Sequence, residues 1–343
     1  MKNVTMIGVD LAKNVFQLHG AAKDGSVVFR KKLTRGQFKQ VMVKQPPCLV
    51  VMEACATCHY WARVVMELGH EVRLIAPIYV KPFVKRQKND AADAEAIVEA
   101  AMRPNMRFVT PKNEGQQARA VVFRAREQLV GQRTQAINAL RAHMAEFGFV
   151  APQGIACVGR LAIVIEDEAT ALPPLARDMC RIFLAQIAGL NTQITSLQKR
   201  IALLAKESAV SRRLQTMPGV GPISAFAVET FSPEMAEFRR GRDFSAWLGL
   251  VPKQHSTGGK QRMGRTSMMG QRDIRRLLII GAMSVIRWAT LKGAPKGSWL
   301  EGMMARKPRM IVAIALANKM ARGLWAMLTK NEGYMDPMAL ASA

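Results

Sequence analysis

Short apolar stretches separated by turn signals dominate the start of the chain. Residues 4–9 are mostly apolar and predict a strand that ends at Asp10. Residues 23–25 (Lys, Asp, Gly) form a turn signal, and residues 26–29 resume an extended pattern after it. These stretches together predict a β-hairpin.

Strand and helix patterns then alternate. Residues 48–52 are continuously apolar, which is typical of a buried strand, and the run ends at Glu53. A helix is predicted over 60–68, a strand over 72–75 and an Ala- and Glu-rich helix over 89–102. This order predicts an α/β domain.

The middle of the chain follows a helical period. Residues 114–147 lack proline and carry apolar residues at helical spacing, and a glycine- and proline-containing connector covers 148–174. A heptad seam of about three repeats comes next. Its members are Phe183, Ile187, Leu190, Ile194, Leu197, Ile201 and Leu204. Such a seam needs a partner helix, which is either the 114–147 helix or another subunit.

A third pattern begins after Ser208. Residues 217–222 (Met-Pro-Gly-Val-Gly-Pro) resemble the hairpin of a helix-hairpin-helix element, in which backbone amides of Gly219 and Gly221 would approach a DNA phosphate. Residues 239–276 hold ten basic and two acidic side chains, and Gly258, Gly259, Gly264 and Gly270 fall within this stretch, so we expect much of it to be loop. Helices are predicted over 274–288 and 310–328.

The charge of the chain narrows the class of partner. Among 343 residues, 50 Lys and Arg face 25 Asp and Glu, for a net charge of +25. A field this positive attracts polyanions, with nucleic acid as the first candidate and an anionic membrane surface as the competitor. Because the charge is spread along the chain and not gathered on one amphipathic helix, the membrane surface is the weaker candidate.

The longest apolar run, residues 277–286, has ten residues, well below the roughly 18 that span a bilayer. The first residues do not form a signal peptide. We therefore expect a cytoplasmic protein without a membrane partner, whose five cysteines remain thiols.

Four carboxylates are candidate metal ligands. Asp10 and Glu53 end two predicted strands, and Asp90 and Asp93 lie three residues apart at the start of a predicted helix, so they share one face. If the strands are neighbours, the four converge, and hard oxygen ligands of this kind suit Mg²⁺, with Mn²⁺ as the alternative ion. Taken singly, each acid is better explained as a turn or helix-cap residue.

A basic run precedes the acidic pair and would suit a phosphate backbone that approaches a metal site. It consists of Lys81, Lys85, Arg86 and Lys88. Such a run is more often a solvated face.

Residues 55–59 (Cys-Ala-Thr-Cys-His) match a haem-attachment pattern. Covalent haem attachment requires export, and no export signal is present. A zinc site would need a second ligand pair at suitable spacing, which is lacking. Buried thiols at a strand-to-helix junction explain the residues better.

Ser256 lies on a Gly-rich stretch beside Lys260, Arg262 and Arg265. A hydroxyl in such a place suits a nucleophile that attacks DNA. Glycines let the protein backbone come close to the DNA backbone, and the cations stabilise negative charge on the phosphate. On local sequence alone, an ordinary Ser/Gly turn is the better explanation.

Taken together, these motifs resemble those of DEDD-type insertion-sequence transposases of the IS110 family, in particular its IS1111 subgroup, with the Piv-type DNA invertases as relatives. The motifs are Asp10, Met52-Glu53-Ala54-Cys55 with His59 and Trp61-Ala62-Arg63, Lys81-Pro82-Phe83-Val84-Lys85-Arg86, Asn89-Asp90-Ala91-Ala92-Asp93-Ala94, Arg126-Glu127-Gln128-Leu129, Pro218-Gly219-Val220-Gly221-Pro222, and Gly249-Leu250-Val251-Pro252 running into Ser256-Thr257-Gly258-Gly259-Lys260. The resemblance covers nearly the whole chain.

The resemblance implies an α/β RuvC-like (RNase H-like) domain over 1–112, a helical coiled-coil region over 113–207 and a mainly helical C-terminal transposase domain over 208–343. It implies Mg²⁺ held by the four carboxylates and a serine that becomes linked to a 5′ phosphate of DNA. It also implies a noncoding guide RNA that pairs with donor and target DNA. Counting back from Gly270 places the family's serine at Ser256, whereas counting forward from Pro252 places it at Thr257.

The sequence thus predicts a transposase that cleaves and rejoins donor and target DNA through a covalent serine intermediate. The metal site and the serine would act on one phosphate, and strand exchange implies a dimer or tetramer, for which the heptad seam offers an interface. Two rival functions are a hydrolytic nuclease of the Holliday-junction-resolving type, in which water attacks, and a non-catalytic nucleic-acid-binding protein.

Overall fold

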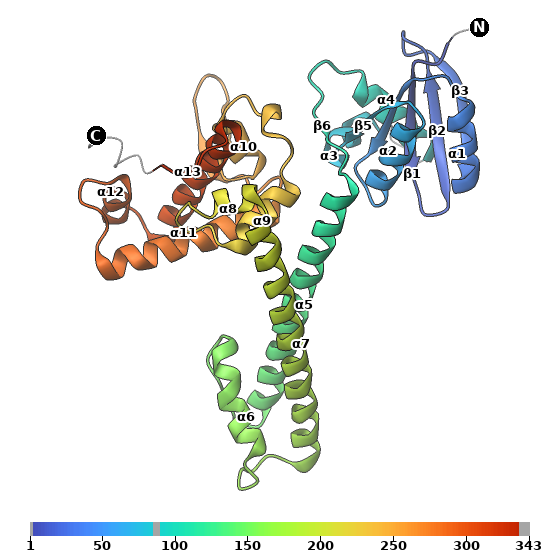
Figure 1. The fold of residues 1–343 in the computed structure, drawn as a ribbon. Coiled ribbons are helices and arrows are strands. Elements are labelled where there is room, and N and C mark those ends of the chain that lie inside the picture. The colour runs from blue at the N-terminus through green and yellow to red at the C-terminus, as the bar shows by residue number, and fades with distance from the viewer. Residues whose placement is uncertain (1–2, 85–89, 336–343) are drawn as a thin grey trace. The chain divides into compact units, whose positions relative to one another are not determined.

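The computed structural model describes residues 3–84 and 90–335, without the side chains of Asp90 and Ala91. Contacts divide the chain into two compact units, Met1–Gln117 and Ala118–Ala343, and each is described by itself. Figure 1 colours the first unit from blue to teal and the second from green to red.

A six-stranded mixed sheet forms the N-terminal unit (Figure 1). Its spatial order is β3-β2-β1-β4-β5-β6. The strands are β1 (Met6–Leu11), β2 (Val15–Ala21), β3 (Val27–Thr34), β4 (Leu49–Glu53), β5 (Glu71–Ile75) and β6 (Phe108–Val109). β1, β2 and β3 form an antiparallel meander, β4 and β5 run parallel to β1, and β6 is antiparallel to β5.

The predicted hairpin between residues 4–9 and 26–29 is wrong in one respect. β2 lies between these two strands and pairs with both. Its polar residues Gln17 and His19 alternate with the buried Phe16 and Leu18, so the strand has two different faces.

Helices cover both faces of the sheet. They are α1 (Arg35–Lys44), α2 (Cys58–Glu67), α3 (Pro77–Val80), a 3₁₀ turn (Lys81–Phe83) and α4 (Asp90–Ala101). On one face Phe16 packs edge-on against Phe38 of α1 and Trp61 of α2, with ring centroids 5.3 and 5.1 Å away. On the other face Val51 packs with Ile97 of α4. Strands β1 and β4 are therefore covered on both sides, which fixes the direction of every side chain along them.

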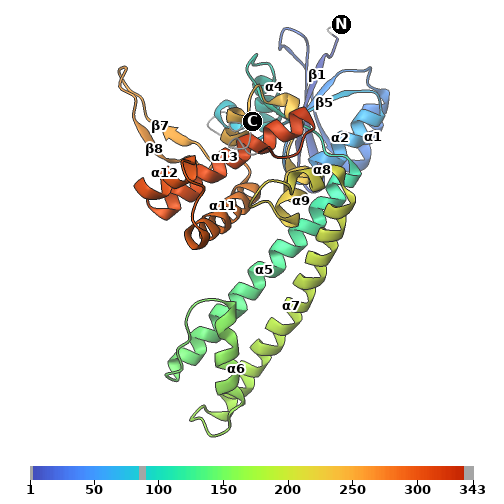
Figure 2. The same ribbon diagram turned by 60° about the vertical axis from the view of Figure 1, so that its left-hand side comes forward.

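Two long helices, α5 (Glu114–Glu146) and α7 (Pro174–Glu207), lie side by side in both views (Figures 1 and 2). Heptad residues of α7, among them Ile187 and Ile201, belong to the same buried clusters as Leu140 and Phe123 of α5. The partner of the seam is therefore the 114–147 helix of the same chain. The prediction that the seam offers a subunit interface is wrong, because its buried side chains are already covered within the chain.

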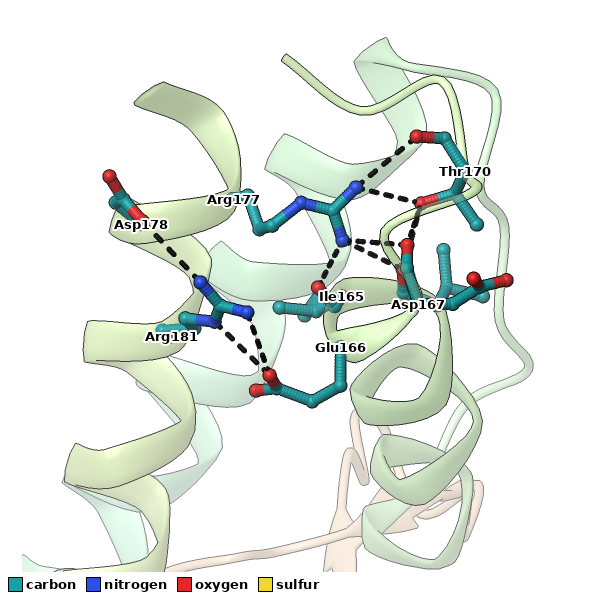
Figure 3. A network of polar contacts seen from close by, with 8 residues as sticks. Ile165, Glu166, Asp167, Thr170, Arg177, Asp178 and Arg181 are labelled. Carbon is teal, nitrogen blue, oxygen red and sulfur yellow. Dashed lines mark hydrogen bonds and ion pairs between the residues drawn. The ribbon is translucent and has the colours of Figure 1, made fainter. Parts of the chain in front are cut away.

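The connector over 148–174 contains a 3₁₀ turn (Ile155–Cys157) and helix α6 (Val158–Glu166), which packs on α7. Arg177 of α7 holds the end of α6 in place (Figure 3). Its guanidinium donates to the backbone carbonyls of Ile165, Asp167 and Thr170 and to Thr170 Oγ1. Arg177 is buried, so its guanidinium needs hydrogen-bond acceptors within the protein. The carbonyls at the end of α6, which have no partner within the helix, provide them.

The rest of the second unit is mainly helical. Its helices are α8 (Ala209–Leu214), α9 (Pro222–Phe231), a 3₁₀ turn (Met235–Glu237), α10 (Gly241–Trp247), α11 (Arg272–Lys292), α12 (Trp299–Arg306) and α13 (Arg309–Lys330). Strands β7 (Pro252–Gln254) and β8 (Met263–Thr266) form an antiparallel hairpin where the sequence predicts loop, with α10 before it. α13 is, among the described residues, the one helix long and apolar enough to cross a membrane, and its buried residues belong to the core of this unit.

Candidate active site

The strand register brings Asp10 and Glu53 together. β1 and β4 are parallel neighbours, and Val9 is aligned with Met52, so the next residue of each strand reaches the same level. Neighbouring strands lie about 4.8 Å apart, and residues at equal register point to the same face. The two predicted ligands therefore lie side by side at the carboxyl ends of their strands.

Alternation along β1 decides which face they use. Gly8 points toward α4, because a Cβ built on it would lie 2.5 Å from the Ala94 carbonyl oxygen and 2.6 Å from Val98 Cγ2. Asp10 lies two residues further and shares this face. Val51, two residues before Glu53, packs in the cluster that includes Ile97 of α4. Both carboxylates thus lie on the face that α4 covers.

Gly8 is a site-forming residue that the sequence interpretation missed. The missing side chain lets the backbone of α4 touch the strand, and this contact positions the first turn of α4, where Asp90 and Asp93 lie in sequence. A glycine inside a predicted strand two residues before a candidate ligand was the available signal.

Electrostatic coupling links three of the four carboxylates. Burial raises the pKa of Glu53, and the negative charges of Asp10 and Asp93 raise it further. All three side chains are half-buried. The side chain of Asp90 lies outside the described part of the chain.

The three carboxylates fit a divalent cation by donor type and by charge. Hard oxygen donors are the ligands of Mg²⁺ and Mn²⁺, and a cation between them would relieve the repulsion felt by Glu53. Among the described side chains, no group of three or more already lies in ligating geometry. The fit therefore rests on Asp10, Glu53 and Asp93 converging from three elements, and not on a closed cage.

The cysteines beside Glu53 are protonated thiols. Burial raises the pKa of Cys55, and the charges of Glu53 and Asp10 add to the shift. Burial also raises the pKa of Cys58 to about 11. Both thiols lie between β4 and the first residue of α2, at the strand-to-helix junction that the sequence predicts.

His59 has a structural role. Its Nδ1 accepts a hydrogen bond of 3.2 Å from the Lys112 amide, and Arg63 donates to the carbonyls of His59 and Lys112. Burial lowers the pKa of His59 to about 4, with the nearby cations Lys112 and Arg63 adding to the shift. The neutral ring therefore joins α2 to the segment that leads into α5.

Of the predicted basic run, Lys81 is exposed in the 3₁₀ turn after α3. Lys85, Arg86 and Lys88 lie outside the described residues. Their approach to a phosphate stays a prediction.

Ser256 precedes the bridged pair Thr257 and Lys260, which closes the tip of the β7–β8 hairpin. Figure 2 labels the two strands of this hairpin. The Lys260 amide donates to the Thr257 carbonyl at 3.1 Å, and Gly258 and Gly259 between them have φ of 56° and 78°. Two consecutive positive φ angles are typical of the tight type I′ turn that suits a twisted hairpin. The glycines thus form the turn, and the hydroxyl stands in solvent next to it.

The side chains of Ser256 and Thr257 are both exposed, and both residues lie between the end of β7 and the glycine turn. The predicted cations Lys260, Arg262 and Arg265 are exposed on the returning arm of the same hairpin. The hairpin therefore presents a hydroxyl and several cations on one projecting element.

The predicted phosphate-binding glycines divide into two kinds. Gly219 has a φ of 84°, and a Cβ there would lie 2.7 Å from the Gly281 carbonyl oxygen in α11, so this glycine permits a tight backbone contact. Gly221 is exposed before α9, with open space around its Cβ position. Its contact with a phosphate stays a prediction.

Comparison with known proteins shows the family of the chain. Residues 7–149 match a family described as a transposase, of the DEDD type of IS110, and residues 211–295 match the transposase IS116/IS110/IS902 family. A "probable family 20 transposase" of Pseudomonas aeruginosa is 46% identical over 97% of this chain and 99% of its own length.

Two insertion-sequence transposases align over similar lengths. The one for element IS1328 of Yersinia enterocolitica is 41% identical over 96% of this chain and 98% of its own length. The one for element IS1111A of Coxiella burnetii is 36% identical over 97% and 92%. Both the acidic domain and the C-terminal region thus match the same kind of enzyme, and the chain belongs to the IS110 family of DEDD-type insertion-sequence transposases, which cleave and rejoin DNA.

Proposed function

We propose that this transposase moves its element by serine recombination, with Ser256 as the nucleophile and a Mg²⁺ site made by Asp10, Glu53, Asp90 and Asp93. The observation that carries the proposal is the convergence of Asp10 and Glu53 at the ends of parallel strands, with Asp93 close enough to raise the pKa of Glu53. Three negative charges held near one another favour a metal-binding role over a structural one.

Each carboxylate has a separate task in this proposal. Asp10 and Glu53 hold the ion from the rigid sheet, whereas Asp93 and Asp90 hold it from α4. The family uses divalent metal, and Mg²⁺ is the proposed ion, with Mn²⁺ as a substitute. When bound, the ion neutralises the scissile phosphate and favours ionisation of the attacking hydroxyl.

The exposed hairpin supplies the nucleophile. Oγ of Ser256 forms a bond to phosphorus, the bond from phosphorus to the 3′ oxygen breaks, and the serine proton ends on the released 3′ hydroxyl. A second 3′ hydroxyl then reverses the step, so the number of phosphodiester bonds is conserved. Lys260, Arg262 and Arg265 are exposed on the same hairpin and balance the charge of the phosphate.

The proposed partners are donor DNA, target DNA and a noncoding guide RNA. A net charge of +25 suits a complex with two kinds of nucleic acid. The proposed contacts with the nucleic-acid backbone are Gly221, Lys81, Lys85, Arg86 and Lys88. Gly219, which is packed against α11, supports the turn that holds Gly221. Strand exchange needs two serines, so a dimer or tetramer in the cytoplasm is part of the proposal, with an interface outside the α5–α7 seam.

A covalent-trapping assay tests the proposal. The full chain is incubated with RNA from the flanks of its element, labelled donor and target DNA, and Mg²⁺, and protein with attached DNA is separated on a denaturing gel. We expect an adduct in the wild type and in Thr257→Ala, and none in Ser256→Ala. Thr257→Ala is the matched control because both hydroxyls stand at the same exposed turn.

Three outcomes would contradict parts of the proposal. An adduct lost only in Thr257→Ala would move the nucleophile by one residue. Cleaved DNA without an adduct in the wild type would favour the hydrolytic nuclease. Adduct formation that survives Asp10→Asn and Asp93→Asn would remove the metal site from the reaction.

A further inference from the structure

A large cavity in the C-terminal unit has no part in the chemistry above. Its volume is about 1630 Å³, and its walls come from α11, α12, α13 and the root of the β7–β8 hairpin, which Figure 2 shows in orange and red. Sites for small molecules usually enclose about 300–1,000 Å³. The cavity therefore suits a segment of a polymer better than a metabolite.

Two exposed tryptophans line this cavity, each with a cation over its ring. Trp288 of α11 is 57% exposed, and Nζ of Lys292 lies 4.7 Å from its ring centroid. Trp299 of α12 is 39% exposed, and Nζ of Lys319 lies 5.0 Å from its ring centroid. Indole rings left in solvent offer flat stacking surfaces, and a cation beside each can meet a phosphate.

All but one of the remaining charged residues of the cavity are positive. Among its described lining residues, Arg265, Arg322 and Lys330 are further exposed cations, and Glu332 is the one acid. The sixth cation, Arg275, is buried and donates to the carbonyls of Leu248 and Met269, so it supports the wall. Most of the other lining residues are aliphatic or methionine, so the two indole rings and the five exposed cations lie on an otherwise apolar wall.

We infer that this cavity binds an unpaired segment of single-stranded DNA, with bases stacked on Trp288 and Trp299 and phosphates held by the exposed cations. Aromatic surfaces interleaved with cations are the means by which proteins hold single strands, whereas a duplex keeps its base faces covered. A second copy of this chain is a poor occupant, because it would bring a net charge of +25 against five exposed cations.

DNA is the occupant that the position favours. Pro252 and Thr266, the paired residues at the root of the hairpin, line the cavity, and Ser256 lies toward the other end of the same hairpin. A strand held in the cavity therefore leads along the hairpin to the hydroxyl. This last step rests on the proposed role of Ser256, but binding of the strand does not.

Fluorescence anisotropy with the full chain tests the inference. The probe is a labelled single-stranded DNA of about 12 nucleotides, in EDTA so that no cleavage occurs. We expect Trp288→Ala and Trp299→Ala each to weaken binding roughly tenfold, and Trp288→Phe, which keeps a stacking ring, to stay near wild type. Ile163→Ala, at a residue that is 73% exposed on α6, is the control and should leave affinity unchanged.

Salt titration and competitors complete the test. We expect Lys330→Ala to reduce the number of counterions released on binding by about one, as measured from the salt dependence of the affinity. A duplex of the same sequence should compete poorly with the labelled single strand. Equal affinity of the wild type and both alanine variants for single-stranded DNA would overturn the inference. A loss of duplex binding in these variants that equals their loss of single-strand binding would also overturn it. If RNA binds more tightly than DNA and this binding depends on the two tryptophans, the occupant is RNA and not DNA. If the tryptophan variants change the oligomer mass but not the affinity for DNA, the cavity is a protein interface.

The failures of the two proposals remain distinguishable. Loss of the Ser256 adduct with intact binding through Trp288 and Trp299 would overturn serine chemistry alone. Intact adduct formation with unaltered strand binding in both tryptophan variants would overturn the cavity alone.

Discussion

Gly8 determines how closely helix α4 approaches strand β1. Its Cβ position is occupied by Ala94 oxygen at 2.5 Å and Val98 Cγ2 at 2.6 Å. We predict that Gly8→Ala lowers the free energy of unfolding by about 1–3 kcal/mol through overpacking and reduces strand transfer at least tenfold, because α4 carries Asp93. Urea denaturation and a strand-transfer assay measure the two effects.

Gly36 is the matched control for Gly8. It lies in α1 with open space at its Cβ position, so Gly36→Ala should leave stability equal or slightly higher. Equal stability of the two alanine variants would show that α4 does not depend on the glycine contact.

His59 gives the N-terminal unit a pH-dependent stability. Its pKa is about 4 in the folded protein, against 6.5 for an unperturbed histidine. As the pH falls below 6.5, His59 becomes protonated in the unfolded state, whereas in the folded state it becomes protonated only near pH 4. The free energy of unfolding therefore falls across this pH window. We predict a loss of at most about 2 kcal/mol from this group, since the ring is half-buried and solvent screens it.

The variant His59→Gln isolates this contribution. A glutamine oxygen can accept the same hydrogen bond from the Lys112 amide but does not titrate. Urea unfolding at about pH 7 and about pH 4.5 should show a smaller loss of stability in the variant than in the wild type. An equal loss in both proteins would refute the assignment.

At the scale of elements, the end of α6 depends on one buried arginine. Arg177 donates to the backbone carbonyls of Ile165, Asp167 and Thr170, whereas Arg181, four residues away, makes exposed ion pairs with Glu166 and Asp178 (Figure 3). We predict that Arg177→Met costs about 1–3 kcal/mol, because buried carbonyls lose their donors. Arg181→Met should change little, since solvent screens its partners.

Limited proteolysis and urea unfolding measure this pair of variants. Faster cleavage within 148–174 in the Arg177 variant alone is the expected result. Equal cleavage in both variants would mean that the loop is held by other contacts.

The β7–β8 hairpin owes its shape to two glycines with positive φ. An L side chain in the left-handed region costs about 1–2 kcal/mol, and Gly259 has a φ of 78°. We predict that Gly259→Val distorts the turn and lowers adduct formation at Ser256 at least tenfold. The melting temperature should stay unchanged, because the hairpin is exposed and outside the core.

Gly297, also at positive φ but outside the hairpin, is the control for this effect. Gly297→Val introduces similar strain in a loop before α12 and should leave the adduct intact. Full adduct formation in Gly259→Val would show that the turn does not orient the serine.

At the scale of the whole molecule, each unit has hydrophobic clusters of its own. We predict two calorimetric transitions, one for each unit. Mg²⁺ should raise the midpoint temperature of the transition of the N-terminal unit alone, which is also the transition that Gly8→Ala should lower. A ligand at one hundred times its dissociation constant stabilises its unit by about 2.7 kcal/mol. Asp10→Asn should abolish the shift, and a Mg²⁺ effect on both transitions would contradict a site confined to the N-terminal unit.

Local patterns were enough to predict the long or strongly apolar elements. The continuous run before Glu53 is buried on both faces of the sheet, and the helical period of 114–147 and the heptad of α7 each bury one face. Such burial is what a run or period of apolar residues records. β2 was missed although Gln17 and His19 alternate with Phe16 and Leu18, because this alternating run is short. The β7–β8 hairpin was missed because its exposed cations and glycines are typical of a loop.

The sequence by itself determined the family and the positive charge, because these follow from residue types and their order, and it predicted which side chains are chemically active. Only the tertiary structure decided that β1 lies beside β4, that the α7 seam is covered by α5 of the same chain, and that Trp288 and Trp299 line one cavity. These contacts join residues far apart in the chain, and their free energy depends on packing that no local window contains.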